Sequence, residues 1–262
     1  MSQTINTIIE DKVATVVLTR PEQRNALNPE MIESLLEVLG QMEENPQIQW
    51  LVLRGEGRSF CAGADIKWFA GACSRSREQN RKEYTRLAEL MKMVYDSSKI
   101  TIGVAHGHVM GGANGLLAAC DFTIAAETTN FGFSEVKLGI IPATILPFVA
   151  RRVSSVNLRK LMLSGVPFGV GQAHAVGLID FIAGENRTDE VLQQLLEELR
   201  VASPSAQKAC KQFIRQLDDG KIGTDDGGAT AGLLAEMLET ADAREGMSAF
   251  LEKRLPSWRL NG

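Results

Sequence analysis

Residues 105–121 read AHGHVMGGANGLLAACD, and three glycines stand where this stretch passes from a strand-like run into a helix-like run. Gly111 and Gly112 suit a tight turn at the start of a helix. Gly115 comes one turn later, inside the expected helix, where glycine costs roughly 0.5–1 kcal/mol relative to alanine. Gly115 therefore needs a reason beyond local backbone conformation.

A second glycine-containing junction, GRSFCAGADIKWF at residues 57–69, follows the apolar run at 50–54. Each junction can present a backbone N–H at the beginning of a helix, where unpaired donors and the helix dipole favour negative charge. Two such donors that converge form an oxyanion hole. Each junction alone also fits a close-packed turn without function, and GGANG lacks the glycine spacing of a dinucleotide-binding loop.

Short apolar or β-branched runs alternate with helical patterns along the first two thirds of the chain. The expected strands are 13–18, 50–54, 100–105 and 121–126, and the expected helices are 28–45, 77–97 and one from 112. This alternation predicts an α/β architecture with buried strands. After about residue 185 only helical patterns remain. We therefore predict an α/β core over residues 1–190 and a helical region over residues 191–262.

The composition narrows the function classes. The chain has 262 residues, 44% of them hydrophobic, and a net charge of −4, which gives no electrostatic reason to expect nucleic acid or a membrane surface as a partner. Its four cysteines and three histidines show no metal-ligand or redox spacing, so no metal is expected. The first residues are polar and partly acidic, unlike a signal or transit peptide. We expect a cytoplasmic protein.

Four motifs occur in a fixed order: NALN (25–28), FCAGADIK (60–67), GHVMGGANGLLAACD (107–121) and FGFSEVKLGIIPA (131–143). With the closing EGMSAFLEKRLPSW, they resemble the crotonase, or enoyl-CoA hydratase/isomerase, superfamily over essentially the whole chain. The resemblance implies a spiral of ββα units with a C-terminal helical trimerisation region, and a homotrimer or a hexamer built as a dimer of trimers. It also implies an acyl-CoA thioester substrate, so that coenzyme A belongs to the substrate and no separate cofactor is required.

The resemblance also implies roles for individual residues. The backbone N–H groups of Ala64 and Gly112 are the oxyanion donors, and Glu135 is the catalytic carboxylate. His108 and Gly115 line the substrate pocket. The expected coenzyme A-binding residues are Arg24, Ala62, Ala64, Asp65, Ile66 and Lys67.

One position departs from the typical hydratase, which carries a glutamate where this chain has Gly115 and a second one matching Glu135. Only Glu135 remains. Its neighbours in sequence are apolar or small, and burial without a partner would raise the carboxyl pKa and suit acid–base chemistry near neutral pH. The alternative is that Glu135 is a helix-terminal carboxylate or forms a surface ion pair with Lys137.

Gly115 is then explained by space and by charge. A branch of the family with GGAxG at this place resembles this chain and looks like 3-methylglutaconyl-CoA hydratases, which act on branched or carboxylated enoyl-CoAs. A carboxylate on the substrate would disfavour a protein carboxylate beside it, because like charges at close range repel. Such a substrate needs a cation, and the candidates are Lys67, Arg81, Lys82, Arg86 and His108.

The predicted function is therefore hydration or dehydration of a branched or carboxylated enoyl-CoA. The alternatives are a Δ3,Δ2-enoyl-CoA isomerase, a decarboxylase of a glutaconyl-type thioester, and an acyl-CoA-binding scaffold without catalysis. The retained Glu135 argues against the scaffold.

Other residues are given structural roles. Cys61 is interpreted as a small buried filler rather than a nucleophile. His108 has no carboxylate beside it in sequence, which favours a structural or pocket-lining role over that of a general base. Asp121 is expected to be structural. The basic segment 75–92 could bind RNA, as in one relative of the family, but its interleaved glutamates favour a solvated helix face.

Overall fold

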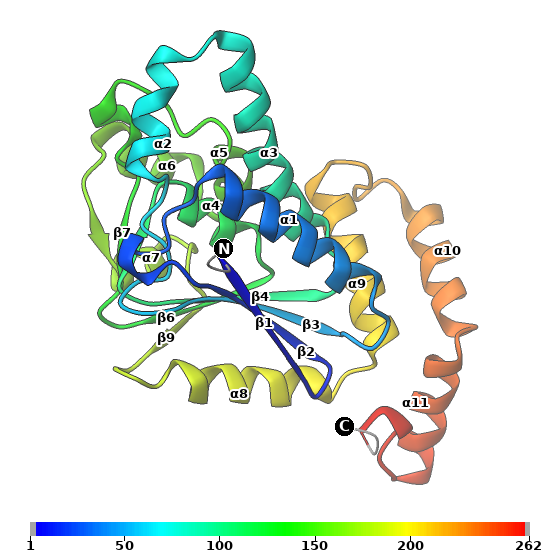
Figure 1. Ribbon diagram of the computed structural model, residues 1–262. Helices are drawn as coiled ribbons and strands as arrows, with labels where there is room; N and C mark the ends of the chain where they lie inside the picture. The colour runs from blue at the N-terminus through cyan, green and yellow to red at the C-terminus, as the bar shows by residue number, and fades with distance from the viewer. Residues whose placement is uncertain (1–3, 260–262) are drawn as a thin grey trace. The chain divides into compact units, whose positions relative to one another are not determined.

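The computed structural model of the protein describes residues 4–259 (Figure 1). The chain divides into two compact units, one ending at Leu192 and the other beginning at Gln193. All of the strands found in the described residues belong to the first unit.

The main sheet of the first unit has six strands in the order β1-β2-β3-β4-β6-β9. These strands are β1 (Ile5–Glu10), β2 (Val13–Leu18), β3 (Trp50–Gly55), β4 (Ile100–Ala105), β6 (Phe122–Ala126) and β9 (Phe181–Ala183). Only β1 and β2 pair antiparallel, and the remaining pairs are parallel. Every residue of β4 is buried, as expected for a central parallel strand covered on both faces. The carboxylate of Asp121 accepts hydrogen bonds from the N–H and hydroxyl of Thr101 at 2.7 and 2.9 Å, the structural role expected of it.

A smaller sheet has the strand order β5-β7-β8. Its strands are β5 (His108–Met110), β7 (Asn130–Gly132) and β8 (Phe168–Gly169). They were not predicted, because strands of two or three residues are too short to show a periodic pattern. This sheet matters for the site, since β5 leads directly into helix α4 (Gly112–Ala119) and β7 precedes the 3₁₀ turn η3 (Glu135–Leu138).

Three helices of the first unit stack in sequence: α1 (Pro29–Glu44) contacts α3 (Arg77–Asp96), which in turn contacts α4 (Figure 1). Local chemistry sets where α1 and α3 begin. The side chain of Asn28 accepts a hydrogen bond from Met31 N at 2.9 Å, and Ser76 and Gln79 form a reciprocal capping box. The other helices of the first unit are α2 (Ile66–Gly71), α5 (Leu146–Arg152), α6 (Ser155–Ser164) and α7 (Val170–Ala175), and α8 (Thr188–Arg200) contains the boundary between the two units.

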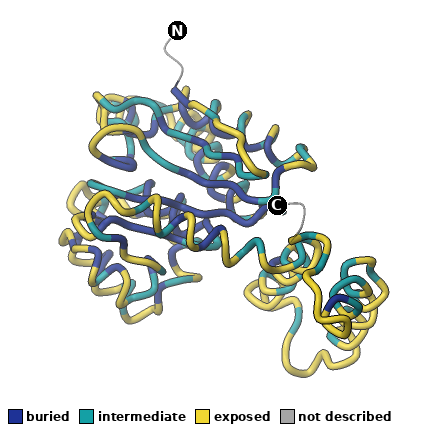
Figure 2. The backbone as a smooth tube through the Cα atoms, turned by 90° about the horizontal axis from the view of Figure 1, so that it is seen from below, coloured by how far each residue is buried: buried dark blue, intermediate teal, exposed yellow. Residues whose placement is uncertain are grey.

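The second unit contains α9 (Pro204–Asp218), α10 (Gly227–Leu238) and α11 (Ala241–Glu252). Asp242 joins the start of α11 to the start of α9 by accepting hydrogen bonds from Ser203 and Ser205 at 2.5 and 2.6 Å. Much of this unit is open to solvent, whereas the central strands β3 and β4 of the first unit are mostly buried (Figure 2). Its exposed large apolar side chains include Ile214, Leu217, Leu234, Leu238, Met247, Phe250, Leu251 and Leu255.

Several features bear on function class. No helix within residues 4–259 combines the length and apolar character needed to cross a membrane. Within the same residues, no group of three or more histidine, cysteine, aspartate or glutamate side chains is arranged to hold a metal ion. All four cysteines are free thiols, with Cys61 and Cys120 buried and Cys73 and Cys210 exposed.

Candidate active site

The two glycine-containing junctions run side by side as parallel backbone segments. Cys61 and Val109 form a parallel bridge, and Met110 N donates a hydrogen bond to Cys61 O at 3.3 Å. This pairing places the segment that carries Ala64 beside the segment that carries Gly112, the two expected oxyanion donors.

Gly63 and Leu27 hold the ends of these segments close together. A Cβ on Gly63 would lie only 2.7 Å from the carbonyl oxygen of Met110, and its φ of +92° is one that glycine adopts readily. Leu27 forms a parallel bridge with Ala64, and its Cδ1 lies 3.4 Å from where a Cβ on Gly112 would stand. Leu27 thus lies next to both of the expected donor residues, Ala64 and Gly112.

The amides of both donor residues are free to bind a ligand. Across residues 4–259, neither Ala64 N nor Gly112 N donates a hydrogen bond to another residue, whereas Gly111 N donates to Gly132 O at 2.9 Å. Gly112 is the first residue of α4, so its N–H is one of the donors that a helix leaves unpaired, at the positive end of the helix dipole. Two adjacent unpaired donors can hold the oxygen of a thioester as negative charge develops on it.

The carboxyl group of Glu135 lies against Gly111, the residue before Gly112. Its Oε1 is 3.0 Å from where a Cβ on Gly111 would stand, so a side chain at position 111 would press on this carboxyl. Its Oε2 is buried and has no hydrogen-bond partner among the described residues. Burial raises the pKa of Glu135, and a hydrogen bond from its own backbone opposes this effect without cancelling it.

The structure does not support the surface ion pair considered for Glu135. No salt bridge joins Glu135 to Lys137 in the described chain. Instead, the Lys137 side chain packs near Gly165, with its Cε 3.2 Å from where a Cβ on that glycine would stand. The carboxyl of Glu135 is therefore left without a cationic partner, which is the condition that keeps its pKa raised.

Asn114 fixes the loop that carries these groups, and sequence reasoning missed it. Its side chain is fully buried, and its Nδ2 donates to Val109 O at 3.2 Å and to Gly132 O at 3.0 Å. These bonds tie the first turn of α4 to β5 and β7, the strands that precede Gly112 and Glu135. The sequence feature that could have pointed to Asn114 is its amide side chain, which stands alone in an otherwise apolar and glycine-rich helix.

The surroundings of Gly115 differ from the expectation. A Cβ at position 115 would lie 2.4 Å from Cγ2 and 2.7 Å from Cβ of Ile145, and 3.2 Å from Sδ of Met91. The volume beside Gly115 is therefore filled by two apolar side chains rather than left open for an acyl group. The prediction that Gly115 leaves open space for the acyl group is wrong, because this glycine accommodates the side chain of Ile145.

The residues expected to bind coenzyme A lie around the beginning of α2. Ala62 N donates to Arg24 O at 2.9 Å, which brings the exposed Arg24 next to the 62–67 segment. Ile66 is 84% exposed despite being a large apolar residue, and Lys67 beside it is also exposed. Arg24, Ile66 and Lys67 are thus open to a ligand.

The carboxylate of Asp65 already has hydrogen-bond and ion-pair partners within the protein. Its carboxylate caps α2 by accepting from Lys67 N at 3.0 Å and Trp68 N at 3.4 Å, and it forms an ion pair with Arg20 at 3.0 Å. This helix beginning lies immediately after Ala64. The side chain of Asp65 therefore shapes the donor loop.

His108 and Cys61 have environments that match their structural interpretation. His108 is exposed on β5, and its Nδ1 lies 3.4 Å from Ser59 Oγ. The thiol of Cys61 is fully buried and donates to Gly63 O at 3.8 Å. Burial raises the pKa of Cys61 to about 12, so the thiolate that a nucleophile requires is scarce near neutral pH.

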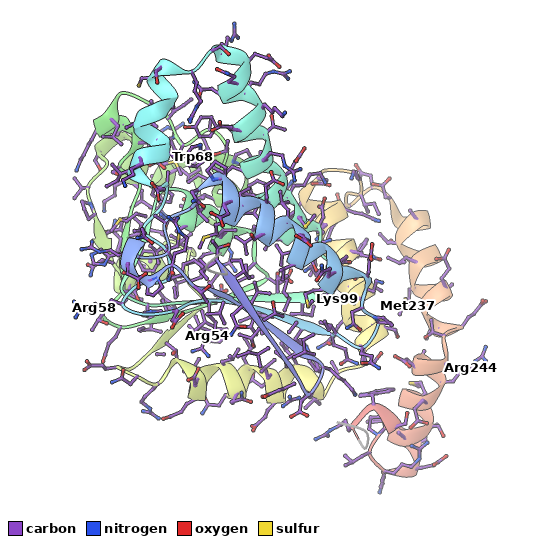
Figure 3. The ribbon with its side chains drawn as sticks, in the orientation of Figure 1. Arg54, Arg58, Trp68, Lys99, Met237 and Arg244 are labelled. Carbon is purple, nitrogen blue, oxygen red and sulfur yellow. The ribbon has the colours of Figure 1, made fainter. Side chains whose placement is uncertain are left out.

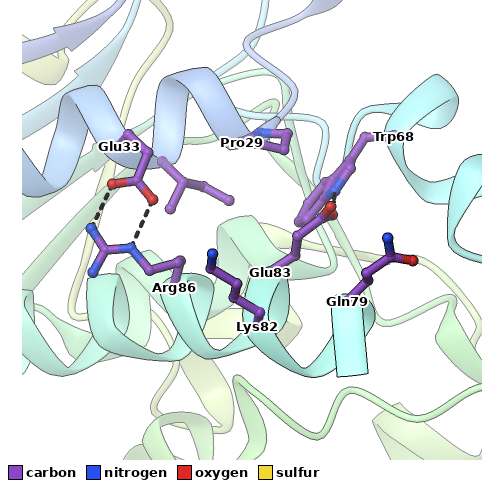
Figure 4. A pocket seen from close by; sticks show the side chains of 8 residues that line it. Pro29, Glu33, Trp68, Gln79, Lys82, Glu83 and Arg86 are labelled. Carbon is purple, nitrogen blue, oxygen red and sulfur yellow. Dashed lines mark hydrogen bonds and ion pairs between the residues drawn. The ribbon is translucent and has the colours of Figure 1, made fainter. Parts of the chain in front are cut away.

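A pocket of about 270 Å³ lies between α1, α2 and α3 (Figure 4). Trp68 reaches it from α2 (Figure 3). The ring centroid of Trp68 lies 5.3 Å from that of Tyr84 on α3. The lining residues are Pro29, Ile32, Glu33, Trp68, Gln79, Lys82, Glu83 and Arg86. Lys82 and Met91 are nine residues apart on α3, which at 100° per residue puts them on opposite faces. The pocket is therefore on the side of α3 away from the Met91–Gly115 contact.

The pocket and the ion pairs along α3 reduce the number of candidate cations that could pair with a carboxylate on the substrate. Lys82 and Arg86 line the pocket between α1 and α3, and Arg86 binds Glu33 and Glu89. Arg81 is paired with Glu78 at 2.7 Å. Of the five candidates, Lys67 and His108 lie on the segments that carry the oxyanion donors. The ion pairs along α3 also match a solvated helix face better than an RNA-binding one.

The chain matches known proteins along nearly its whole length. The family described as Enoyl-CoA hydratase/isomerase matches residues 8–261. A Mycosarcoma maydis protein named enoyl-CoA isomerase/hydratase fer4 is 33% identical over 261 residues, with 92% of this chain and 90% of that protein covered. The 2,3-dehydroadipyl-CoA hydratase of Escherichia coli K12 is 31% identical over 262 residues, with 95% of this chain and 96% of that protein covered.

The fold has equally close counterparts among solved structures. The crystal structure of an enoyl-CoA hydratase from Shewanella pealeana superposes with a TM-score of 0.93 at 34% identity, and the superposition covers 98% of this chain and 96% of that one. Such similarity over both sequence and structure shows the crotonase fold. The chain therefore belongs to the enoyl-CoA hydratase/isomerase family.

Proposed function

We propose that the protein adds water to, or removes water from, the double bond of a branched or carboxylated enoyl-CoA, such as a 3-methylglutaconyl-CoA-like thioester. The observation that carries this proposal is the buried, unpartnered Oε2 of Glu135, whose carboxyl lies against Gly111, together with the unpaired amides of Ala64 and Gly112. The E. coli relative supports the substrate class, because 2,3-dehydroadipyl-CoA is itself a carboxylated enoyl-CoA.

In the proposed reaction, the thioester oxygen accepts hydrogen bonds from Ala64 N and Gly112 N. The ionised Glu135 takes a proton from water while the water oxygen bonds to C3, and the double-bond electrons move to give an enolate in the oxyanion hole. The protonated Glu135 then delivers that proton to C2 as the enolate collapses. A single carboxyl serves as base and then as acid, and a pKa raised toward neutrality suits both steps. Dehydration is the reverse sequence.

The reaction type is tested by incubating the protein separately with 3-methylglutaconyl-CoA, crotonyl-CoA and a 3-enoyl-CoA, followed by mass spectrometry. We expect a gain of water, fastest with 3-methylglutaconyl-CoA. An unchanged mass with a shifted double bond would instead identify an isomerase, and loss of carbon dioxide a decarboxylase. No product from any of the three would identify a binding scaffold. Each of these last three results overturns the proposal.

The pH dependence follows from the environment of Glu135. Burial raises the pKa of its carboxyl, and the base form is the ionised one. We therefore expect kcat/KM for hydration to fall as pH decreases through that raised pKa, at a pH above the ordinary value of about 4.3 for glutamate. A pH–rate profile with a chemically inert buffer series measures this limb. A profile that stays flat down to pH 4.5 in the folded protein would contradict the assignment of Glu135 as base.

We also propose that the protein is a homotrimer or a dimer of trimers. The second unit exposes large apolar side chains, with Phe250 at 78% and Leu251 at 75%, and such surface is usually covered in a stable assembly. Light scattering coupled to size-exclusion chromatography is expected to give three or six times the 28.6 kDa chain mass. An active species of single-chain mass at micromolar concentration would refute the assembly.

A further inference from the structure

Ile145 and Gly115 form a complementary pair in the interior of the first unit. Ile145 stands at the N-cap of α5, is 1% exposed, and points its branched side chain at the backbone of Gly115 in α4. Because Cγ2 of Ile145 is 2.4 Å from where a Cβ on Gly115 would stand, the two positions cannot both carry ordinary side chains. Met91 on α3 also packs here, because its Sδ lies 3.2 Å from where a Cβ on Gly115 would stand.

The pair lies close to the proposed catalytic carboxyl. Gly111 and Gly115 are four residues apart at the start of α4, about one helical turn. Glu135 lies over Gly111, and Ile145 lies over Gly115. The first turn of α4 is therefore covered by the carboxyl of Glu135 at Gly111 and by the hydrocarbon side chain of Ile145 at Gly115. A polar side chain at position 115 would need the space that Ile145 occupies.

We infer that Ile145 is a specificity-determining residue of the acyl site, which blocks a second carboxylate at position 115 and makes α4 apolar one turn from Gly111, the residue that Glu135 contacts. The inference rests on the proposed function and refines its substrate class. The part of the acyl group nearest Ile145 is hydrocarbon, because a carboxylate there would lose its hydration without gaining a partner.

The contact itself is tested by a double-mutant cycle that needs no substrate. Gly115→Ala is expected to lower Tm by about 2–8 °C through overpacking. Ile145→Gly is expected to lower it by about 5–15 °C through loss of buried volume. Glycine is used at position 145 because Cβ of Ile145 also lies 2.7 Å from where the new methyl would stand. In the Ile145→Gly background, Gly115→Ala should no longer lower Tm.

Val149→Ala is the matched control. Val149 is fully buried one helical turn further along α5, but it is not among the atoms nearest to Gly115. In the Val149→Ala background, Gly115→Ala should lower Tm as much as in the parent protein. Equal costs of Gly115→Ala in the parent and the Ile145→Gly background would overturn the inference.

The specificity is tested by calorimetric binding of two saturated thioesters, linear butyryl-CoA and branched, carboxylated 3-methylglutaryl-CoA. Ile145→Gly is expected to change the ratio of their Kd values at least threefold, and Val149→Ala to leave it unchanged. Adding Gly115→Glu to Ile145→Gly should weaken 3-methylglutaryl-CoA at least tenfold relative to butyryl-CoA through like-charge repulsion. Ratios within twofold of the parent in both Ile145 variants would overturn the inference. Neither the melting measurements nor the calorimetric binding depends on turnover. A failure of the inference about Ile145 is therefore distinct from a failure of the proposed hydration.

Discussion

Glu135→Gln is expected to lower the kcat for hydration by about 10²–10⁴-fold while leaving acyl-CoA affinity nearly unchanged. Glutamine keeps the shape of the side chain beside Gly111 but can neither take a proton from water nor return one to C2. Position 115 is a glycine covered by Ile145 and therefore supplies no second carboxylate to replace it. Steady-state kinetics with the preferred enoyl-CoA, together with calorimetric Kd values for a saturated analogue, measure the two effects separately.

Two controls separate lost chemistry from lost structure. Glu10→Gln removes an exposed glutamate on β1 and should leave kcat within twofold of the parent. The Glu135→Gln variant itself should melt at least as high as the parent at pH 7.5. A carboxyl whose pKa is raised by folding destabilises the folded state at pH values above both its unfolded and folded pKa, and this penalty vanishes as pH falls below both. A fully folded Glu135→Gln protein within tenfold of the parent kcat would refute the single-carboxylate mechanism.

Ala64→Pro is expected to abolish measurable turnover by removing one of the two oxyanion donors. Loss of one such donor in comparable sites raises the barrier by roughly 3–4 kcal/mol, which corresponds to about 10²–10³-fold in rate. Proline also restricts the preceding residue, and Gly63 has a positive φ of +92°, so the backbone strain adds to the effect. The measurement is kcat/KM, accompanied by circular dichroism and Tm to establish that the variant is folded.

The matched control for this variant is Ala64→Gly, which changes the side chain but retains the N–H. It should keep turnover within about fivefold of the parent, and replacement of the Ala64 amide by an ester should reproduce the loss without the ring of proline. If an ester at position 64 stays within threefold of the parent, Ala64 N is not an oxyanion donor.

Much of the first unit was predictable from local pattern. The apolar runs at 13–18 and 100–105 became β2 and β4 with the expected bounds, because buried parallel strands read as continuous apolar segments. The helix after Asn28 and the helix from 77 were equally clear, because each has an apolar stripe and a capping residue. The short strands of the smaller sheet were missed, since their pairing depends on partners distant in sequence.

The sequence by itself determined the α/β class, the glycine junctions that contain Ala64 and Gly112, and the presence of one carboxylate at position 135 where a typical family member has two. Only the tertiary structure decided that Cys61 and Val109 pair the two glycine-containing segments, that Asn114 ties α4 to β5 and β7, and that Ile145 fills the space beside Gly115. The physical reason is the range of the interactions. Periodicity and capping act within one or two helical turns, whereas packing against a glycine is set by whichever distant side chain the fold brings to it, and a glycine in the sequence does not reveal what covers it.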